Sequence, residues 1–461
     1  MNGAGHRAKD KNMNMKLLTV SALALTMGSA AALAKVSLQE ASLIGTTLTK
    51  MGAEKAGNQA GTIPAYTGGL AHQENADPYE NIFADEKPLF TITASNLEKY
   101  KTNLSDGQIA LFKKFPATYK MPIYKTHRTA SFPDRIYDKA KKNATRVELI
   151  GNGSGLKDFD ETVPFVIPKS GVEVVWNHIS RYRGGSIELN RAVIPVQRSG
   201  DYVVVKGRSM LTAPQYLKDG YSAKKDDNIL FYYTYLTKSP ARLTGNVLLV
   251  HETVDQVTQP RMAWTYNAGQ RRVRRAPQVA YDAPTPSGDG LVTSDQTDMY
   301  NGAPNRYNWK LVGKKEVYIP YNSYKLADTT AKYSDIVQDQ HIDQDFTRYE
   351  LHRVWQVEAT LKEGSRHIYG KRTFYVDEDS WQVALVDHYD NRGELWRAAE
   401  GHALQFVNAN TPWYVSDTSY DLLSGRYLVR LANEERNAFV FDKKVKRKDF
   451  TSAAIRRMGK R

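Results

Sequence analysis

The feature that most limits the fold is a series of short segments, after about Arg146, in which apolar and polar residues alternate. Alternation with a period of two places one set of side chains on each face of a β-strand. Short turns such as Glu363-Gly364 separate the segments, which is typical of an antiparallel meander. Strands are therefore expected at 202–208, 228–236, 245–253, 262–267, 272–275, 309–318, 349–361, 367–377, 382–389, 395–407, 413–421 and 427–431.

The segment 349–361 illustrates the pattern. One face is mostly apolar, with Arg353 among positions 349, 351, 355, 357, 359 and 361. The other face is polar at 350, 352, 356, 358 and 360, with Val354 as the exception. We expect the first face to meet apolar side chains and the second to meet polar surroundings. Together with the next strands, the apolar faces could form one concave or packed surface.

Helical patterns dominate the region before these strands. Ser37-Leu38-Gln39-Glu40 is a capping box that predicts a helix over about 38–55. Further helices are expected at 97–115, with a fresh start at Ser105, at 134–142, at 172–182 and near 327–337. The interpretation is a β-dominated α+β protein. Its parts are a mainly helical segment at 35–145, a β-sheet domain at 146–442 and a basic tail at 443–461.

The first 34 residues have the pattern of a secretory signal peptide. Arg7, Lys9, Lys11 and Lys16 precede an uncharged stretch rich in Leu and Ala, which ends in Ala32-Leu33-Ala34. Cleavage is expected after Ala34, and a membrane anchor is the alternative interpretation of the same stretch. Translation from Met13 or Met15 would give a leader of more usual length.

The chain contains no cysteine, which excludes disulfides, thiolate nucleophiles and cysteine metal ligands. It also excludes the lipidated cysteine of a bacterial lipoprotein, so we expect an unlipidated protein free in the periplasm. Removal of the leader, with four Lys and Arg against one Asp, lowers the net charge from +14 to +11. A basic surface fits anionic lipid or lipopolysaccharide, and nucleic acid is not an expected partner in that compartment.

Sequence motifs of catalysis are missing. We find no G-x-S-x-G elbow, no P-loop and no G-x-G-x-x-G motif, so no catalytic residue and no cofactor is predicted. The acidic run 377–379 lies in a predicted turn, although two carboxylates converging across a cleft would suit a hydrolase. Histidines occur on successive predicted strands, but none has H-E-x-x-H spacing, so no metal site is predicted. These histidines are His352, His367, His388 and His402.

Several longer motifs resemble a known family. They are GTIPAYTGG at 61–69, AWTYNAGQRRVRRAP at 263–277, YNWKLVG at 307–313, IPYN at 319–322 and YELHRVWQVEA at 349–359. Together they resemble domain-of-unknown-function family 1329, whose members are often labelled outer membrane lipoprotein-sorting proteins. The resemblance covers nearly all of the chain after the leader.

The resemblance implies a fold similar to the LolA/LolB lipoprotein carriers: a large curved antiparallel sheet, forming an incomplete barrel around an apolar cavity, with helices as a lid. It implies a non-enzymatic periplasmic carrier or chaperone for a lipid, a lipoprotein acyl chain or an apolar exported metabolite, moving toward the outer membrane. It also implies association with a resistance-nodulation-division type inner-membrane exporter and an outer-membrane protein. An adaptor subunit without its own ligand and an envelope hydrolase are the alternatives. Because the chain lacks the cysteine that would be lipidated, a carrier that moves freely through the periplasm is favoured over an acceptor anchored in the outer membrane.

Two groups of residues are expected to bind the ligand if the interior is a cavity. An ordinary packed core is the alternative for the first group, the expected lining, which consists of Trp264, Tyr266, Trp355, Val357, Phe374, Leu385 and Trp396. Arginines bind phosphate and carboxylate through two parallel hydrogen bonds, which suits lipid headgroups. The second group is Arg271, Arg272, Arg274, Arg275 and Arg353. For the four arginines between 271 and 275 there are two alternatives: solvated charges at the end of a hairpin, or ion pairs with carboxylates such as Asp282.

Overall fold

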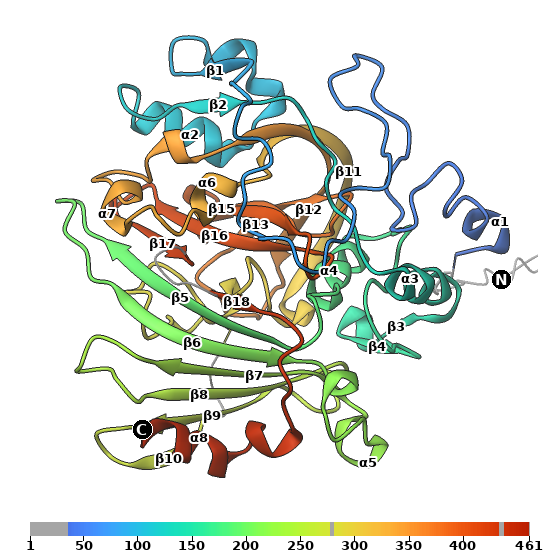
Figure 1. The fold of residues 1–461 in the computed structure, drawn as a ribbon, viewed down its shortest axis with the longest axis vertical. Helices are drawn as coiled ribbons and strands as arrows, with labels where there is room; N and C mark the ends of the chain where they lie inside the picture. Colours follow the sequence, from blue (N-terminus) through green and yellow to red (C-terminus); the bar gives the residue numbers. More distant parts are fainter. Residues whose placement is uncertain (1–35, 277–280, 433–437, 461) are drawn as a thin grey trace, which may run out of the picture. The chain divides into compact units, whose positions relative to one another are not determined.

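The computed structural model describes residues 36–276, 281–432 and 438–460, so the predicted signal peptide lies outside the described residues. Sixteen strands form one sheet, which confirms the β-dominated α+β class (Figure 1). Fourteen of them follow in the order β1 (Phe90–Ile92), β2 (Met121–Ile123), β12 (Tyr349–Leu361), β13 (Lys371–Asp377), β14 (Val383–Tyr389), β15 (Leu395–Phe406), β16 (Thr411–Asp421), β17 (Tyr427–Leu431), β5 (Ile187–Val196), β6 (Val205–Thr212), β7 (Ile229–Thr237), β8 (Val247–Thr253), β9 (Met262–Asn267) and β10 (Arg272–Arg275). This order does not close on itself: β1 and β10 are its two ends.

Two further strands lie beside this order. Strand β11 (Tyr307–Pro320) pairs with β12, and β18 (Phe439–Val440) pairs with β5. Neighbouring strands are antiparallel except at the contact of β12 with β2, where Tyr349 pairs in parallel with Ile123. A separate two-stranded sheet consists of β3 (Glu148–Ile150) and β4 (Gly155–Lys157).

Most predicted strands are confirmed, and β9, β10, β12 and β17 have the predicted bounds. The prediction missed β5, which lies at the centre of the order between β17 and β6. Its sequence contains Pro195, a residue that argues against a central strand because proline cannot donate to the ladder. In the structure Pro195 pairs with Leu428 near the end of β5, beyond the last pair with β6, Val193 with Val205.

The longer helices are α2 (Asp106–Lys114), α3 (Asp134–Arg146) and α4 (Gly171–Ser180), and each confirms a predicted start. The Ser105 side chain accepts a hydrogen bond from the Gln108 backbone, which forms a capping box at the predicted start of α2. Helix α2 packs on β15, and α4 packs on β11. The shorter elements are η1 (Leu97–Lys99), η2 (Lys101–Asn103), η3 (Gly151–Gly153), η4 (Pro214–Tyr216), α5 (Ala223–Asp226), η5 (Ser294–Gln296), η6 (Pro304–Arg306), α6 (Tyr324–Ala327), α7 (Tyr333–Ile336) and η7 (Gln344–Phe346).

The helix predicted over 38–55 is wrong beyond its first turn, α1 (Leu38–Ala41). Tertiary contacts decide the path of the following residues. The Trp381 indole donates to the Met51 carbonyl over 2.9 Å. Gly52 has a φ of +87° and approaches Val166 so closely that a Cβ would lie 1.9 Å from the Val166 carbonyl oxygen. A helix could not make this approach.

The polar face of β12 was expected in polar surroundings, and the structure places its first half, at Glu350 and His352, among buried polar partners. Glu350 and His352 are at most 1% exposed. Residues outside β12 cover them: the His127 backbone donates to Glu350 over 2.7 Å, and Tyr321 stacks on His352 with ring centroids 4.0 Å apart. This half of the face is therefore polar and dry, with Glu350 paired to Arg348 at 2.7 Å, whereas Thr360 at the other end of the face is exposed.

The stretch 443–461, predicted only as a basic tail, is folded against the sheet. It forms η8 (Arg447–Phe450) and α8 (Ser452–Gly459), which lie against the last strands of the sheet (Figure 1). Phe450 and Ile455 are buried in a cluster with Leu249. The prediction considered only the charges of this stretch, whereas its apolar residues gather on one side of α8 and provide the contact.

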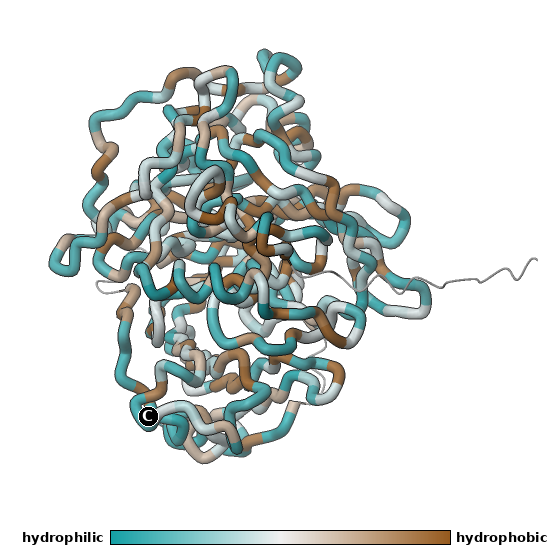
Figure 2. The backbone as a smooth tube through the Cα atoms, turned by 90° about the vertical axis from the view of Figure 1, so that its right-hand side faces the viewer, coloured by the Kyte–Doolittle hydropathy of each residue, from teal (hydrophilic) through white to brown (hydrophobic). Residues whose placement is uncertain are grey.

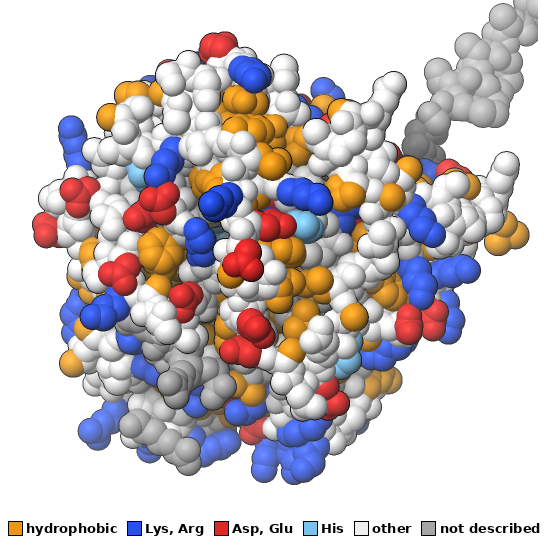
Figure 3. Space-filling model, turned by 45° about the horizontal axis from the view of Figure 1, so that its top comes forward, with side chains coloured by type: hydrophobic (Ala, Val, Ile, Leu, Met, Phe, Trp, Pro, Cys, Tyr) orange, Lys and Arg blue, Asp and Glu red, His pale blue; other side chains and the backbone are white. Residues whose placement is uncertain are grey.

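Hydrophobic positions lie mainly along the inner parts of the chain, and hydrophilic residues predominate in the peripheral loops (Figure 2). On the face shown in Figure 3, Lys and Arg side chains lie among Asp and Glu side chains. No helix among the described residues combines the length and the apolar character that a membrane crossing requires.

Candidate ligand-binding cavity

A cavity of about 520 Å³ lies against the sheet between β5 and β9. Its first wall consists of side chains two residues apart along β5 and β7, because alternate residues of a strand point to the same face. The residues from these two strands are Ile187, Leu189, Arg191, Val193, Phe231, Tyr233, Tyr235 and Thr237. Ser209 and Leu211 of β6 and Leu248 and Val250 of β8 extend the same wall.

The second wall comes from the segment 283–301, which includes η5. Arginines fix this segment at three places, and at two of them the arginine comes from a strand of the sheet. Arg397 donates to the carbonyl oxygens of Gly290 and Leu291 over 2.9 and 2.8 Å. Arg372 lies 2.6 Å from Asp295, a carboxylate of η5. Because charge-assisted hydrogen bonds are among the stronger ones in proteins, we expect this wall to be preformed.

The third anchor of the segment is also part of the cavity wall. Asp298 accepts from Arg181 over 2.6 Å and from Arg183 over 2.8 Å. Burial alone would raise the pKa of Asp298, but the two guanidinium groups outweigh it and hold the pKa well below its usual range. Burial and the charge of Arg181 lower the pKa of Arg183 to about 10, so this arginine stays charged at neutral pH.

Four more charged side chains, in two clusters, line the cavity. Arg261 donates to Glu252 over 2.7 Å and to the Asn301 carbonyl over 2.7 Å. On the opposite side of the strand order, Arg430 of β17 donates to Asp417 of β16. The guanidinium of Arg191 lies 3.8 Å from the same carboxylate. The cavity thus combines an apolar lining with charged groups at defined points of its wall.

One of the seven side chains expected to line a cavity, Tyr266, lies on this wall. Trp264, next to it on β9, faces His251, with ring centroids 4.8 Å apart. The other five come from β12–β15. Val357 and Phe374 are fully buried in the main core, and Leu385 belongs to a smaller buried cluster with Val317.

The two remaining tryptophans also have protein partners. Trp355 stacks on Trp381 with ring centroids 6.2 Å apart. Trp396 donates from its indole to Asp421 over 3.0 Å. The residues that sequence reasoning missed are those of β5 to β8, although the alternation at 229–237 would have identified Phe231, Tyr233 and Tyr235 as one face.

The arginines expected at a headgroup site do not lie together. Arg272, Arg274 and Arg275 are exposed on β10, and Arg271 occupies the turn before it with a φ of +53°. Among the described residues, no carboxylate forms an ion pair with these four. The alternative of pairing with Asp282 is not formed, because Asp282 pairs with Arg306 at 3.5 Å.

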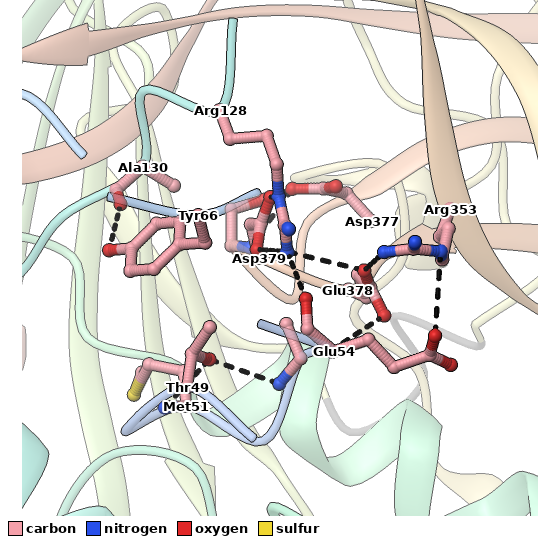
Figure 4. Close-up of polar contacts among 12 residues, drawn as sticks. Thr49, Met51, Glu54, Tyr66, Arg128, Ala130, Arg353, Asp377, Glu378 and Asp379 are labelled. Atoms are coloured by element: carbon pink, nitrogen blue, oxygen red, sulfur yellow. Dashed lines mark hydrogen bonds and ion pairs between the residues drawn. The ribbon is translucent and has the colours of Figure 1, made fainter. Parts of the chain in front are cut away.

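Arg353 of β12 belongs to a buried ionic network (Figure 4). Its guanidinium lies 3.3 Å from Glu378 and 3.5 Å from Glu54. In the same network Arg128 donates to both oxygens of Asp379 over 2.8 and 2.7 Å. This network joins the N-terminal segment to the turn after β13.

A metal ion could be held at one place in the described part of the chain, where His352, Asp377 and Asp379 offer ligand atoms within 4.8 Å of one another. Arg128 already occupies both oxygens of Asp379, and Ser380 donates to Asp377 over 2.5 Å. Burial and the charge of Asp379 raise the pKa of Asp377 to about 6. Arg128 thus provides the positive charge that a metal would provide to these carboxylates.

The other three candidate histidines lie outside this group. His367 lies 3.2 Å from Asp295, His388 lies 2.9 Å from Gln296, and His402 is fully buried in β15. Burial lowers the pKa of His402 to about 3, so it is neutral at physiological pH.

Comparison with known proteins gives the following similarities. Residues 91–456 match the family described as "Protein of unknown function (DUF1329)". The "Uncharacterized protein PA3922" of Pseudomonas aeruginosa is 55% identical over 452 residues, which cover 96% of this chain and 99% of that protein. A solved DUF1329 family protein from Desulfovibrio piger shares 15% identity with a TM-score of 0.41, over 58% of this chain and 91% of its own. LolA superfamily protein NE2245 from Nitrosomonas europaea shares 12% identity with a TM-score of 0.36, over 62% and 98%.

Proposed function

The chain belongs to the DUF1329 family, and from that premise we propose that it is a periplasmic, non-enzymatic carrier or chaperone that binds a hydrophobic molecule. The molecule is a lipid, a lipoprotein acyl chain or an apolar exported metabolite, and it moves toward the outer membrane. The single observation that carries this proposal is the cavity between the sheet and the segment 283–301.

The size and lining of the cavity support a small apolar ligand. Its volume of 520 Å³ lies within the range of about 300–1,000 Å³ that is usual for small-molecule sites. Aliphatic and aromatic side chains from β5, β7 and β8 face Pro284 and Pro286 across it. An apolar molecule placed there would leave water and gain dispersion contacts with these side chains.

The fixed second wall also supports a binding role. Because Arg397, Arg372, Arg181 and Arg183 hold the segment 283–301, the ligand would not have to order this segment when it binds. Preorganisation of this kind raises affinity by lowering the entropic cost of association.

Location and partners follow from the leader and the family. An apolar molecule needs a carrier in the aqueous space between two membranes, which is where the predicted signal peptide would deliver this protein. The proposed partners are an inner-membrane exporter of the resistance-nodulation-division type and an outer-membrane protein. Crosslinking in whole cells tests them: capture of these proteins without any bound small molecule would favour the adaptor role.

The carrier role is tested on protein purified from the periplasm. Native mass spectrometry and organic extraction should find an apolar molecule bound at about one per chain, and the stripped protein should bind a fluorescent fatty-acid probe. Leu248→Trp places an indole in the cavity and should weaken probe binding at least tenfold. Val203→Trp, at a position 49% exposed, is the matched control and should bind normally. No extracted molecule together with no probe binding would rule the proposal out.

A further inference from the structure

The charged side chains around the cavity carry an excess of positive charge. Its lining includes four arginines, at 183, 191, 261 and 430, and two aspartates, at 298 and 417. Directly behind this lining, Arg181 shares Asp298 and Glu252 pairs with Arg261. Among the described residues of this group, five arginines therefore face three carboxylates, a formal excess of two positive charges.

The arginines differ in how far their hydrogen-bonding capacity is used. Arg183 donates to Asp298 and to the carbonyls of Arg181 and His178. Arg261 donates to Glu252 and to the Asn301 carbonyl. The guanidinium of Arg191, in contrast, makes no hydrogen bond with any residue that the structure describes, and its Nε is buried without a partner. The unused donors are thus concentrated at Arg191.

Among the described residues, the carboxylate that forms an ion pair with Arg191 is already engaged. Asp417 lies 3.8 Å from Arg191, beyond hydrogen-bond distance, and it accepts a hydrogen bond from Arg430. A guanidinium has five N–H donors, and leaving them unsatisfied away from water is costly. An anionic group that accepts two parallel hydrogen bonds is the ligand for which this geometry is suited.

A neutral donor lies on the same face of the sheet. Arg191 pairs with Gly207 of β6, and Ser209, two residues further along β6, pairs with Tyr235 of β7. The Tyr235 hydroxyl is buried and has no hydrogen-bond partner among the described residues. Burial raises the pKa of Tyr235 to about 12, so the hydroxyl keeps its proton and can donate it to an anion.

We propose that the molecule bound in the cavity is an anionic amphiphile, whose carboxylate or phosphate oxygens accept hydrogen bonds from Arg191, Arg430 and Tyr235 while its acyl chain lies against the apolar lining. This inference rests on the proposed function and names its ligand class. It places the headgroup inside the cavity, on β5, β17 and β7, and away from the exposed arginines of β10.

The test compares ligands that share one chain and differ in the head. Dissociation constants are measured on stripped protein at pH 8 for oleate, oleoyl lysophosphatidate and oleyl alcohol, with acetate and inorganic phosphate as headgroups without a chain. We expect oleate, lysophosphatidate or both to bind at least tenfold more tightly than oleyl alcohol. The preferred one distinguishes a carboxylate from a phosphate ligand. Acetate and phosphate alone should show no binding at millimolar concentration.

The variants locate the headgroup. Arg191→Met keeps the apolar stem and removes the charge, so it should weaken binding of the anionic ligand about tenfold and leave oleyl alcohol unchanged. Tyr235→Phe should weaken the same ligand by a smaller factor, and it tests the site independently if Arg191→Met does not fold. Arg392→Met, in an exposed turn, is the control and should change nothing.

The outcomes separate the two proposals. Two results would overturn the anionic headgroup site and leave the carrier role intact. The first is equal affinity for oleate and oleyl alcohol. The second is that Arg274→Met weakens binding of the anionic ligand and Arg191→Met does not. Binding of free phosphate without any chain preference would show a simple anion site and overturn the amphiphile. No binding of any chain-bearing ligand would overturn both.

Discussion

The ring of Tyr235 lies against the backbone of Gly207 on the neighbouring strand: a Cβ atom at Gly207 would be 2.2 Å from the Tyr235 hydroxyl oxygen and 2.3 Å from the ring carbon that carries it. Gly207 is on β6 and Tyr235 is on β7, and Gly207 pairs with Thr237, two residues beyond Tyr235. Because residue 207 has no side chain, the ring can lie on the sheet, and the space beside it remains part of the cavity.

Gly207→Ala should therefore reduce ligand capacity. The new methyl group cannot coexist with the ring in its present position, so the ring must move toward the cavity. We expect probe affinity to fall about tenfold, with a stability loss of about 1–3 kcal/mol from overpacking. Gly269→Ala is the matched control, since its Cβ would lie 3.4 Å from its nearest neighbour, Asn267. Unchanged probe affinity in Gly207→Ala would mean that the ring does not limit the cavity.

Arg128→Met should strongly destabilise the protein. Arg128 and Asp379 are buried, and among the described residues Asp379 accepts hydrogen bonds from Arg128 alone. Removal of the guanidinium leaves an uncompensated buried carboxylate, which costs about 3–5 kcal/mol. Urea unfolding measures the loss, and Lys50→Met, which breaks the exposed pair with Asp134, should leave the transition nearly unchanged. Similar unfolding midpoints for the two variants would contradict the importance of this network.

Glu400 should make stability depend on pH near neutrality. Burial raises its pKa to about 7, although Tyr349 and Gln108 donate to it over 2.9 and 3.3 Å. A carboxyl whose pKa is higher in the folded state than its ordinary value of 4.5 stabilises below pH 4.5, and this contribution is lost as the pH rises through 7. Between pH 6 and 8 the loss from this one group is about 1 kcal/mol.

Glu400→Gln removes that titration. The unfolding free energies of the variant and the wild type are measured in urea at pH 6, 7 and 8. The difference, variant minus wild type, should be about 1 kcal/mol larger at pH 8 than at pH 6. Asp387, whose pKa burial also raises to about 7, is present in both proteins and contributes to both curves. Parallel curves would show that Glu400 is already ionised at pH 6.

Ile455→Ala should loosen the C-terminal helix. Ile455 is fully buried in the cluster that contains Leu249 and Tyr266, and the loss of its methyl and methylene groups there costs about 2–5 kcal/mol. Because Tyr266 also lines the cavity, probe affinity should fall together with the thermal midpoint. Arg456→Ala, on the exposed side of α8, is the control for both measurements. A stable variant with normal probe binding would show that the helix is not required for the cavity wall.

Strand bounds could be predicted because alternation is a local property of the chain. The bounds of β9 and β12 follow from the residues within each strand and from the turns beside them. Strand β5 could not be recognised in this way, since Pro195 is tolerated only because of where the pairing with β6 ends. The helix predicted over 38–55 failed for a similar reason, because Trp381 and Val166 fix its path from far away in the sequence.

The cavity could not be located from residue type. Large apolar side chains such as Phe374 fill cores, and a cavity wall requires faces that meet incompletely, which depends on the distant segment 283–301. The same holds for arginine. Arg353 and Arg191 look alike in sequence, but Glu378 and Glu54 neutralise the first, whereas the second shares one carboxylate with Arg430.

The last strand of the sheet also affects how copies of this protein meet. Strand β10 has four residues and, among the described strands, pairs with β9 alone, so its outer edge offers backbone groups to any extended chain. Arg272, Arg274 and Arg275 are exposed along it. Two such edges would bring six guanidinium groups together, and this repulsion acts over about 10 Å at 0.1 M salt. The arginine-rich edge therefore protects the protein against edge-to-edge aggregation, and this protection weakens as salt concentration rises.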